Sequence, residues 1–211
     1  MKRAIIIISV IIGLLPIFNN NSYANYPISV GPYLGIKGGV NAADVPNGTY
    51  NGFAFCNLPE IGISSYFPFV DKSSFGGGLN LAYSTDAFLT EINDTKTTYQ
   101  FNYFKLSPHL YASGFILGLN IGIPLSGTSE TKNITTDAKI ADMSTAIDIK
   151  IGGVITVFSN QIGRFNIVIE GSYSLSGILQ KKYLDEYNYH PGQMWLGLNY
   201  MFNVQKPDEG E

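Results

Sequence analysis

The stretch FILGLNIGI, residues 115–123, alternates large apolar side chains with a second set of residues. Its odd-numbered positions are Phe, Leu, Leu, Ile and Ile, whereas its even-numbered positions include two glycines and Asn120. A β-strand sends successive side chains to opposite faces, so this period of two predicts a strand with one apolar face.

Seven other segments show the same alternation, three of them less regularly. A membrane β-barrel produces this pattern, because every second residue of each strand faces lipid. We therefore expect eight strands, at residues 30–40, 60–67, 75–84, 98–111, 115–123, 147–157, 165–175 and 193–202.

The connections between these segments alternate in length. Four are long and polar (residues 41–58, 85–97, 124–142 and 176–192), and three are short (residues 69–74, 112–114 and 158–163). An eight-stranded outer-membrane barrel with both termini in the periplasm has four long extracellular loops and three short periplasmic turns. The sequence therefore predicts an all-β fold, an eight-stranded antiparallel transmembrane β-barrel.

The segment at residues 98–111 changes phase in its middle. Tyr99, Phe101 and Tyr103 form one apolar row, and Phe104 and Leu106 continue it in the other phase. A slip of one residue within a strand is typical of a β-bulge, so we expect one here. Proline has no N–H, so the proline that follows at position 108 is expected where no ladder hydrogen bond is needed.

The composition limits the possible functions. Of the 211 residues only 14% are charged, against about 25% in an ordinary soluble domain. The net charge is −3 and there is no basic stripe, so we expect no binding to nucleic acid. The chain has one cysteine, Cys56, which excludes a disulfide within the chain and a zinc site built from several cysteines.

The first 24 residues have the pattern of a secretory signal peptide. Lys2 and Arg3 precede an apolar run at residues 4–18, and a polar segment ends in Ser-Tyr-Ala at Ala24. The run is shorter than the roughly 20 residues that a spanning helix needs. We expect cleavage after Ala24, a barrel at residues 25–203, and a short hydrophilic periplasmic tail at residues 204–211. The predicted location is the outer membrane of a Gram-negative bacterium.

Three motifs resemble a known family. They are GPYLGIKGG at residues 31–39, YFKLSPHL at residues 103–110 and the ending GLNYMF at residues 197–202. The chain resembles the outer-membrane β-barrel domain family of the Bacteroidetes–Chlorobi type, called PorT-like. The ending is similar to the β-signal read by the barrel assembly machinery, which would make Gly197, Tyr200 and Phe202 the assembly signal. The resemblance implies this fold and this partner during biogenesis, and it carries no activity or active-site residues.

The rows opposite the apolar ones hold nearly all the charges within the predicted strands. A barrel of eight strands is just wide enough for side chains to fill it, and buried acids and bases should pair. We interpret these residues as a structural polar network that closes the lumen. The alternative is a gate in which the pairs switch and pass ions. The five residues are Lys37, Glu60, Asp148, Lys150 and Glu170.

No residue set points to catalysis, a cofactor or a metal. His109 is expected near the periplasmic end of its strand, and His190 lies in the last long loop. Neither has a serine or an acid at a spacing that forces them together. Cys56 is interpreted as a small packed residue.

The sequence thus favours a monomeric, non-enzymatic protein with a structural or surface-interaction role. Its partners would be outer-membrane lipid and, through the long loops, an extracellular ligand, because binding usually resides in loops. Two alternatives stay open: a narrow transporter or channel for small hydrophobic compounds, and a membrane-embedded lipid-modifying enzyme.

Overall fold

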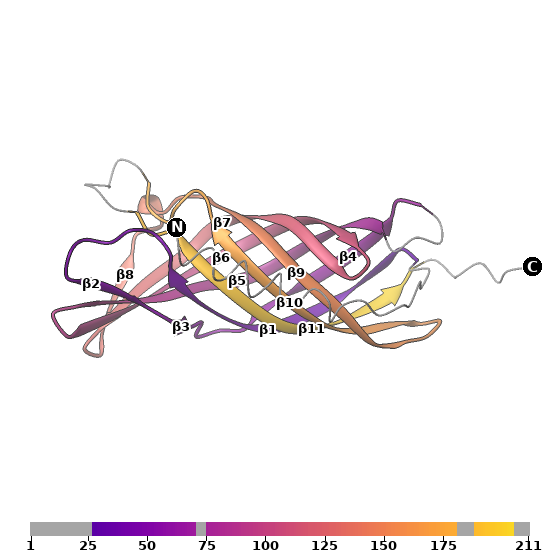
Figure 1. Ribbon diagram of the computed structural model, residues 1–211, viewed down its shortest axis with the longest axis horizontal. Helices are drawn as coiled ribbons and strands as arrows, with labels where there is room; N and C mark the ends of the chain where they lie inside the picture. The colour runs from indigo at the N-terminus through magenta and orange to yellow at the C-terminus, as the bar shows by residue number, and fades with distance from the viewer. Residues whose placement is uncertain (1–26, 71–74, 181–187, 205–211) are drawn as a thin grey trace, which may run out of the picture.

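A computed structural model describes residues 27–70, 75–180 and 188–204. The described residues form eleven strands, and eight of them make the wall of a barrel (Figure 1). The wall strands are β1 (Ser29–Asn41), β4 (Glu60–Pro68), β5 (Phe75–Ile92), β6 (Thr95–Ala112), β7 (Phe115–Thr131), β9 (Ala146–Ser159), β10 (Gly163–Ser174) and β11 (Pro191–Asn203).

The wall is antiparallel and closed. Sequential wall strands pair from β1 through β4 to β11, and β11 pairs with β1 from Ser29↔Asn203 to Asn41↔Pro191. Closure satisfies the backbone of every wall strand on both sides and leaves no open edge. This confirms the predicted eight-stranded antiparallel barrel. Seven of the eight predicted segments lie within one wall strand, and the eighth, residues 165–175, runs one residue past the end of β10.

The alternation of side chains decides the two faces of this wall. In β1 the residues Leu34 and Ile36 are more than half exposed on the outer surface, whereas the neighbouring Lys37 is 6% exposed and points into the bore. The same holds around the barrel, so the polar rows meet inside and the apolar rows lie outside. The middle of the barrel therefore has an apolar outer surface and holds its charged side chains inside, beside a buried cluster of Tyr33, Ala82, Ile116, Val168 and Trp195.

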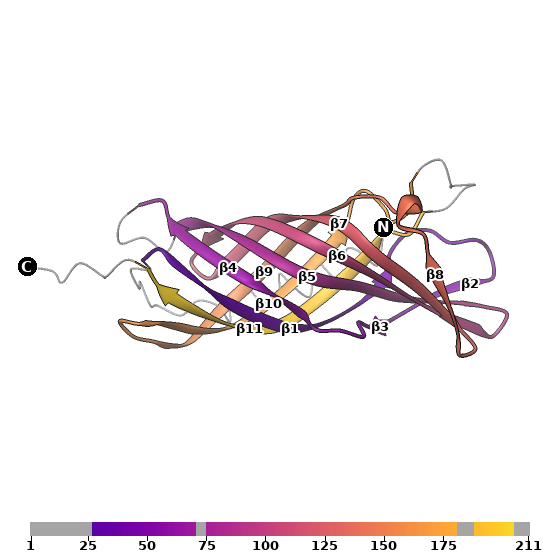
Figure 2. The same ribbon diagram turned by 180° about the vertical axis from the view of Figure 1, so that it is seen from behind.

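The two ends of the barrel differ. At one end, where β1 begins and β11 ends, the connections between wall strands are short. We call this the terminus end. The opposite end, the hairpin end, carries the extended hairpins that protrude on the left in Figure 1 and on the right in Figure 2.

Two predicted loops are wrong. Residues 85–97 and 124–142 form hairpins for most of their length: β5 runs to Ile92 and β6 starts at Thr95, while β7 continues to Thr131 and pairs with β8 (Ile134–Ala138). Both residues of each turn, 93–94 and 132–133, have φ between 48° and 64°, as in the tight hairpin turns that match strand twist. The sequence misled because these strand ends lack an apolar outer row.

The hairpins join into a sheet beyond the barrel. β2 (Thr49–Gly52) pairs with the end of β5, and β8 pairs with the end of β7. We call residues 49–52, 88–92, 95–101, 127–131 and 134–138 the projecting sheet. The short β3 (Ala54–Phe55) pairs with β1 below it, and a 3-10 helix, η2 (Ile140–Asp142), follows β8.

The predicted bulge in residues 98–111 is also wrong for that strand. β6 keeps one phase from end to end, so Phe101, Tyr103 and Lys105 all point inward. The irregularity lies in its pairing with β7, where Leu125 is the extra residue between Asn102 and Tyr103 of β6. Pro108 faces outward, and the pairing of β6 with β7 is interrupted around it, as the missing N–H requires.

The predicted signal peptide, residues 1–24, and all but the first residue of the predicted tail lie outside the described residues. In the part of the chain that is described, no helix is long and apolar enough to cross a membrane.

Candidate functional site

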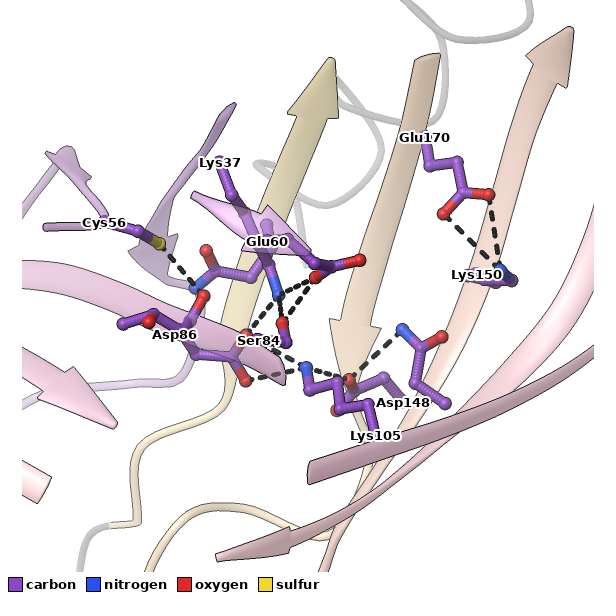
Figure 3. Close-up of polar contacts among 12 residues, drawn as sticks. Lys37, Cys56, Glu60, Ser84, Asp86, Lys105, Asp148, Lys150 and Glu170 are labelled. Atoms are coloured by element: carbon purple, nitrogen blue, oxygen red, sulfur yellow. Dashed lines mark hydrogen bonds and ion pairs between the residues drawn. The ribbon is translucent and has the colours of Figure 1, made fainter. Parts of the chain in front are cut away.

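A chain of charges crosses the bore of the barrel (Figure 3). The Lys37 ammonium lies 3.5 Å from Glu60 and 2.5 Å from Asp86. The Lys105 ammonium lies 3.0 Å from Asp86 and 3.1 Å from Asp148. Acids and bases therefore alternate along a line that starts on β4 and passes β1, β5 and β6 to end on β9. We call these five residues the charge chain.

A second pair lies beside the charge chain. The Lys150 ammonium on β9 is 3.3 Å from the Glu170 carboxylate on β10. The two predicted neighbours, Lys37 with Glu60 and Lys150 with Glu170, thus come together across adjacent strands. Asp148 does not bind Lys150 in this arrangement and pairs with Lys105 instead. Whether the five predicted residues serve a structural purpose stays a prediction.

The sequence analysis missed the central members, Asp86 and Lys105. Both lie on inward rows whose phase was already visible: Asp86 continues the row of Asn80, Ala82 and Ser84. It was missed because the predicted strand stopped at Ser84. Lys105 lies between two outward residues of β6 and was overlooked.

Lys105 reaches Asp148 past an intervening strand. β7 lies between β6 and β9, and the residue opposite Lys105 on β7 is Gly122. Gly122 adds no side chain here, and Asn120 of the same strand also donates to Asp148. The ion pair thus links strands that are not neighbours, a contact that adjacency of strands does not predict.

Other polar groups complete the charge chain. Glu60 accepts hydrogen bonds from the Tyr33 hydroxyl at 3.3 Å and from the Ser84 hydroxyl. The Ser84 oxygen in turn accepts a hydrogen bond from the Lys37 ammonium at 2.8 Å. Asn120 donates to Asp148 at 3.4 Å. Removing ions from water is costly unless they are paired and hydrogen-bonded. Every charge of this cluster is paired, and among the described residues only Asp148 Oδ1 of these carboxylates is buried without a hydrogen-bond partner.

Two small cavities lie between the side chains of the bore. A cavity of about 20 Å³ lies among the charge chain, the Lys150–Glu170 pair and the indole of Trp195. A second cavity, of about 40 Å³, lies toward the terminus end, where the Arg164 guanidinium sits 4.8 Å above the ring of Tyr66. Each has room for no more than a few water molecules.

The hairpin end is filled by apolar side chains. We call this set the aromatic cluster: Phe88, Phe101, Tyr103, Met143, Ala146 and Ile178, with Tyr99, Ala138, Leu179 and Tyr189 packed against it. The ring centroids of Phe88 lie 5.0 Å from those of Tyr99 and Tyr189. Nearby, Gln193 on β11 donates to the carbonyl of Ala87 on β5 at 3.0 Å, so two facing walls meet. The described side chains at this end thus pack against one another across the bore.

The two histidines make no catalytic arrangement. His109 points inward, where Nδ1 lies 2.8 Å from the carbonyl oxygen of Ser107 and its ring contacts Tyr111. His190 Nδ1 lies 2.9 Å from the backbone carbonyl of Ser174 rather than from a hydroxyl. Within residues 27–70, 75–180 and 188–204, no group of three or more His, Cys, Asp or Glu residues is placed to hold a metal ion.

Cys56 lies in the connection between β3 and β4. Its thiol donates to the carbonyl oxygen of Thr85 at 3.0 Å, and its backbone N–H donates to the backbone carbonyl oxygen of Lys37. Burial raises the pKa of this thiol to about 12, so it is protonated at neutral pH. A thiolate is the nucleophilic form, and the surroundings of Cys56 disfavour it.

The residues of the predicted assembly signal lie on β11. Gly197 points inward beneath the ring of Trp195, where an added Cβ would collide with that ring. Tyr200 and Phe202 point outward near the terminus end, with ring centroids 4.8 Å apart. Their role in assembly stays a prediction.

Comparisons with known proteins add shape alone. No protein-family model matches the chain, and no curated protein matches its sequence. Among solved structures, Ail, the attachment invasion locus protein of Yersinia pestis, is 13% identical with a TM-score of 0.45, covering 83% of this chain and 99% of its own.

Two further solved structures are similar at the same level. Neisserial surface protein A is 9% identical with a TM-score of 0.40, covering 82% of this chain and 96% of its own. The outer membrane protein OprG from Pseudomonas aeruginosa is 11% identical with a TM-score of 0.37, covering 86% and 99%. Such values carry no inference about function, and the PorT-like resemblance stays a prediction.

Proposed function

We propose that this protein is an exported, monomeric outer-membrane barrel with a closed lumen, and that it acts by surface interaction through its hairpin end. It is not an enzyme in this proposal. The observation that carries the proposal is the contrast between the charge chain that crosses the bore and the hairpins that extend beyond it. With the lumen closed, the part that remains available to a partner is the projecting sheet.

The outer surface supports membrane insertion. Large apolar side chains stand exposed on seven of the eight wall strands and are half-exposed on β10, and a water-soluble protein rarely exposes a belt of this size. Along this belt the charges of the wall strands point the other way, into the bore. Members of the belt include Leu34, Ile36, Ile63, Leu81, Leu110, Leu119, Ile123, Ile149, Val157, Leu196 and Leu198.

The closed bore supports a role other than transport. The charge chain and the Lys150–Glu170 pair put three lysines and four carboxylates across the middle of the barrel. A path for small hydrophobic compounds would have to pass these groups, and desolvating them is costly. Neither histidine supports a role as a lipid-modifying enzyme, because the Nδ1 atoms of His109 and His190 lie next to backbone carbonyl oxygens rather than a serine hydroxyl.

The test is accessibility together with conductance. One variant carries an epitope tag between Asn93 and Asp94, in the β5–β6 turn, and a matched control carries the same tag at Gln161, in the β9–β10 turn. We expect antibody to label the first tag on intact cells and the second only after permeabilisation. Purified protein in a planar bilayer should give no large, steady conductance.

Opposite results would contradict distinct parts of the proposal. Recovery of the mature chain as a soluble monomer without detergent would overturn membrane insertion. Labelling of the Gln161 tag on intact cells would reverse the orientation. A steady conductance that disappears when the bore is blocked would overturn the closed lumen.

A further inference from the structure

The inner face of the projecting sheet carries rows of hydroxyl groups. Residues directly opposite in antiparallel strands share a face, so Thr90, Thr97, Thr131 and Ile134 form one row across β5, β6, β7 and β8. Asn51 on β2 lies opposite Thr90 and extends the row. The Thr97 and Thr131 hydroxyls are 2.8 Å apart, which agrees with this placement.

The next row holds aromatic rings. Phe88, Tyr99, Ser129 and Thr136 lie opposite one another, and the rings of Phe88 and Tyr99 are stacked with an interplanar angle of 20°. Tyr189 adds a ring from the β10–β11 connection, and its hydroxyl donates to that of Tyr99 at 3.4 Å. Phe88 is buried beneath them, whereas Tyr99, Tyr189 and Ser129 are half-buried and Thr136 is exposed.

All four charged residues within these strand segments lie on the other face. Glu91, Lys96, Glu130 and Asp137 alternate with the inner residues along each strand. The inner face therefore offers aromatic rings, neutral hydroxyl and amide groups, and the exposed apolar side chains of Ile92 and Ile134, while Thr90 is buried. Hydroxyls both donate and accept hydrogen bonds, as sugar hydroxyls do, and aromatic rings stack on the apolar C–H face of a sugar.

We propose that the inner face of the projecting sheet, centred on Tyr99 and Tyr189, binds a neutral oligosaccharide. This inference rests on the proposed function and names the chemistry of its partner. A charged polysaccharide would require lysine or arginine on this face, and its strand segments supply none. The hydroxyl rows would orient the sugar ring while Tyr99 and Tyr189 hold its apolar side.

The oligosaccharide comes from outside the cell. The inner face turns toward the axis of the barrel, above the bore. Sugars on neighbouring membrane lipids would meet the opposite face, which carries Glu91, Lys96, Glu130 and Asp137. The neutral surface is thus the one that adjacent lipids do not reach.

The test is calorimetric titration of the full mature chain with maltohexaose, laminarihexaose and chitohexaose. The protein is folded in lauryldimethylamine oxide, because a detergent with a sugar headgroup would compete. At least one of the three should bind. Tyr99→Ala and Tyr189→Ala should each weaken it about tenfold, since an aromatic contact is lost. Tyr99→Phe keeps the ring and should change affinity less than about threefold.

Two further variants keep the result interpretable if an alanine variant folds poorly. Thr97→Val with Thr131→Val preserves shape and removes two hydroxyls, and it should weaken binding about tenfold. Glu130→Gln lies on the outer face of the same sheet and should leave affinity unchanged. Folding of each variant is checked by the shift of its band on an electrophoresis gel with and without heating.

Three results would overturn the inference. The first is that none of the three probes binds at millimolar concentration. The second is that no inner-face variant changes the affinity. The third is salt-sensitive binding of polygalacturonate that Lys96→Gln abolishes. A protein that labels at the Asn93 tag and conducts no current, yet binds no oligosaccharide, would retain the proposed function and lose only this assignment.

Discussion

The middle of the barrel and its hairpin end have opposite designs. In the middle the outer surface is apolar and the interior holds the charge chain. At the hairpin end the charges of the projecting sheet, such as Glu91 and Glu130, lie outside, and the interior holds the aromatic cluster. The same strands, β5, β6 and β7, run through both regions. β5 and β6 keep one phase, whereas β7 changes phase at its extra residue, Leu125.

The difference follows from the medium around each region. Where lipid surrounds the wall, apolar side chains are placed outside and polar ones must satisfy one another within. Where water surrounds the sheet, the hydrophobic effect drives the aromatic rings inward. The hairpin end therefore folds as a water-soluble sheet attached to a membrane barrel.

The largest expected effect is on the charge chain. Lys105→Met leaves Asp86 and Asp148 buried without their shared cation, and breaking a buried pair in this way should lower the free energy of unfolding by about 4 kcal/mol. Urea unfolding in lipid vesicles measures it.

Two controls separate charge from packing. The double variant Lys105→Met, Asp148→Asn removes the carboxylate left without a cation, since Asp86 still pairs with Lys37, and should recover part of the loss. Lys96→Met, on the exposed face of the same strand, should leave the free energy of unfolding unchanged. Equal effects of Lys105→Met and Lys96→Met would show that the ion pairs do not stabilise the bore.

A somewhat smaller effect is expected in the aromatic cluster. Phe88 is fully buried, and Phe88→Ala should lower the free energy of unfolding by about 3 kcal/mol through lost contacts and a cavity. The loss should be local to the hairpin end, so amide hydrogen exchange should rise in residues 95–101 before it rises in β9 and β10. Uniform exchange throughout the barrel would argue against two separately organised regions.

The smallest of the three effects tests the outer surfaces directly. Ile149→Arg places a charge on the lipid-facing row of β9 and should lower the free energy of unfolding by about 2 kcal/mol in vesicles. Thr135→Arg, on the outer face of the projecting sheet, should leave it unchanged because that face meets water. Equal destabilisation by the two substitutions would show that the edge of the lipid layer does not coincide with the end of the apolar outer rows.

The sequence predicted the barrel because the alternation of residues 115–123 and its seven counterparts needs no knowledge of distant contacts. It failed at residues 85–97 and 124–142 because strands in water do not need an apolar outer row. The change of phase after Tyr99, Phe101 and Tyr103 was also wrongly interpreted as a bulge. These rings point inward because the surrounding medium changes along the strand, which the local pattern does not reveal.

The candidate site divided in the same way. Lys37 with Glu60 and Lys150 with Glu170 could be expected from neighbouring strands. Lys105 could be placed inside the bore, but its reach past Gly122 to Asp148 depends on how three strands lie together. The position of Tyr189 over Phe88 and Tyr99 depends on a connection distant in sequence.

By itself the sequence determined which residues face inward in the lipid-facing part, because a period of two is a local property of the backbone. Only the tertiary structure decided which inward residues meet. Barrel closure and strand register bring Asp86 between Lys37 and Lys105, and they assemble the rings and hydroxyls of the projecting sheet on one face. Those distances are set by strands far apart along the chain, so no local pattern encodes them.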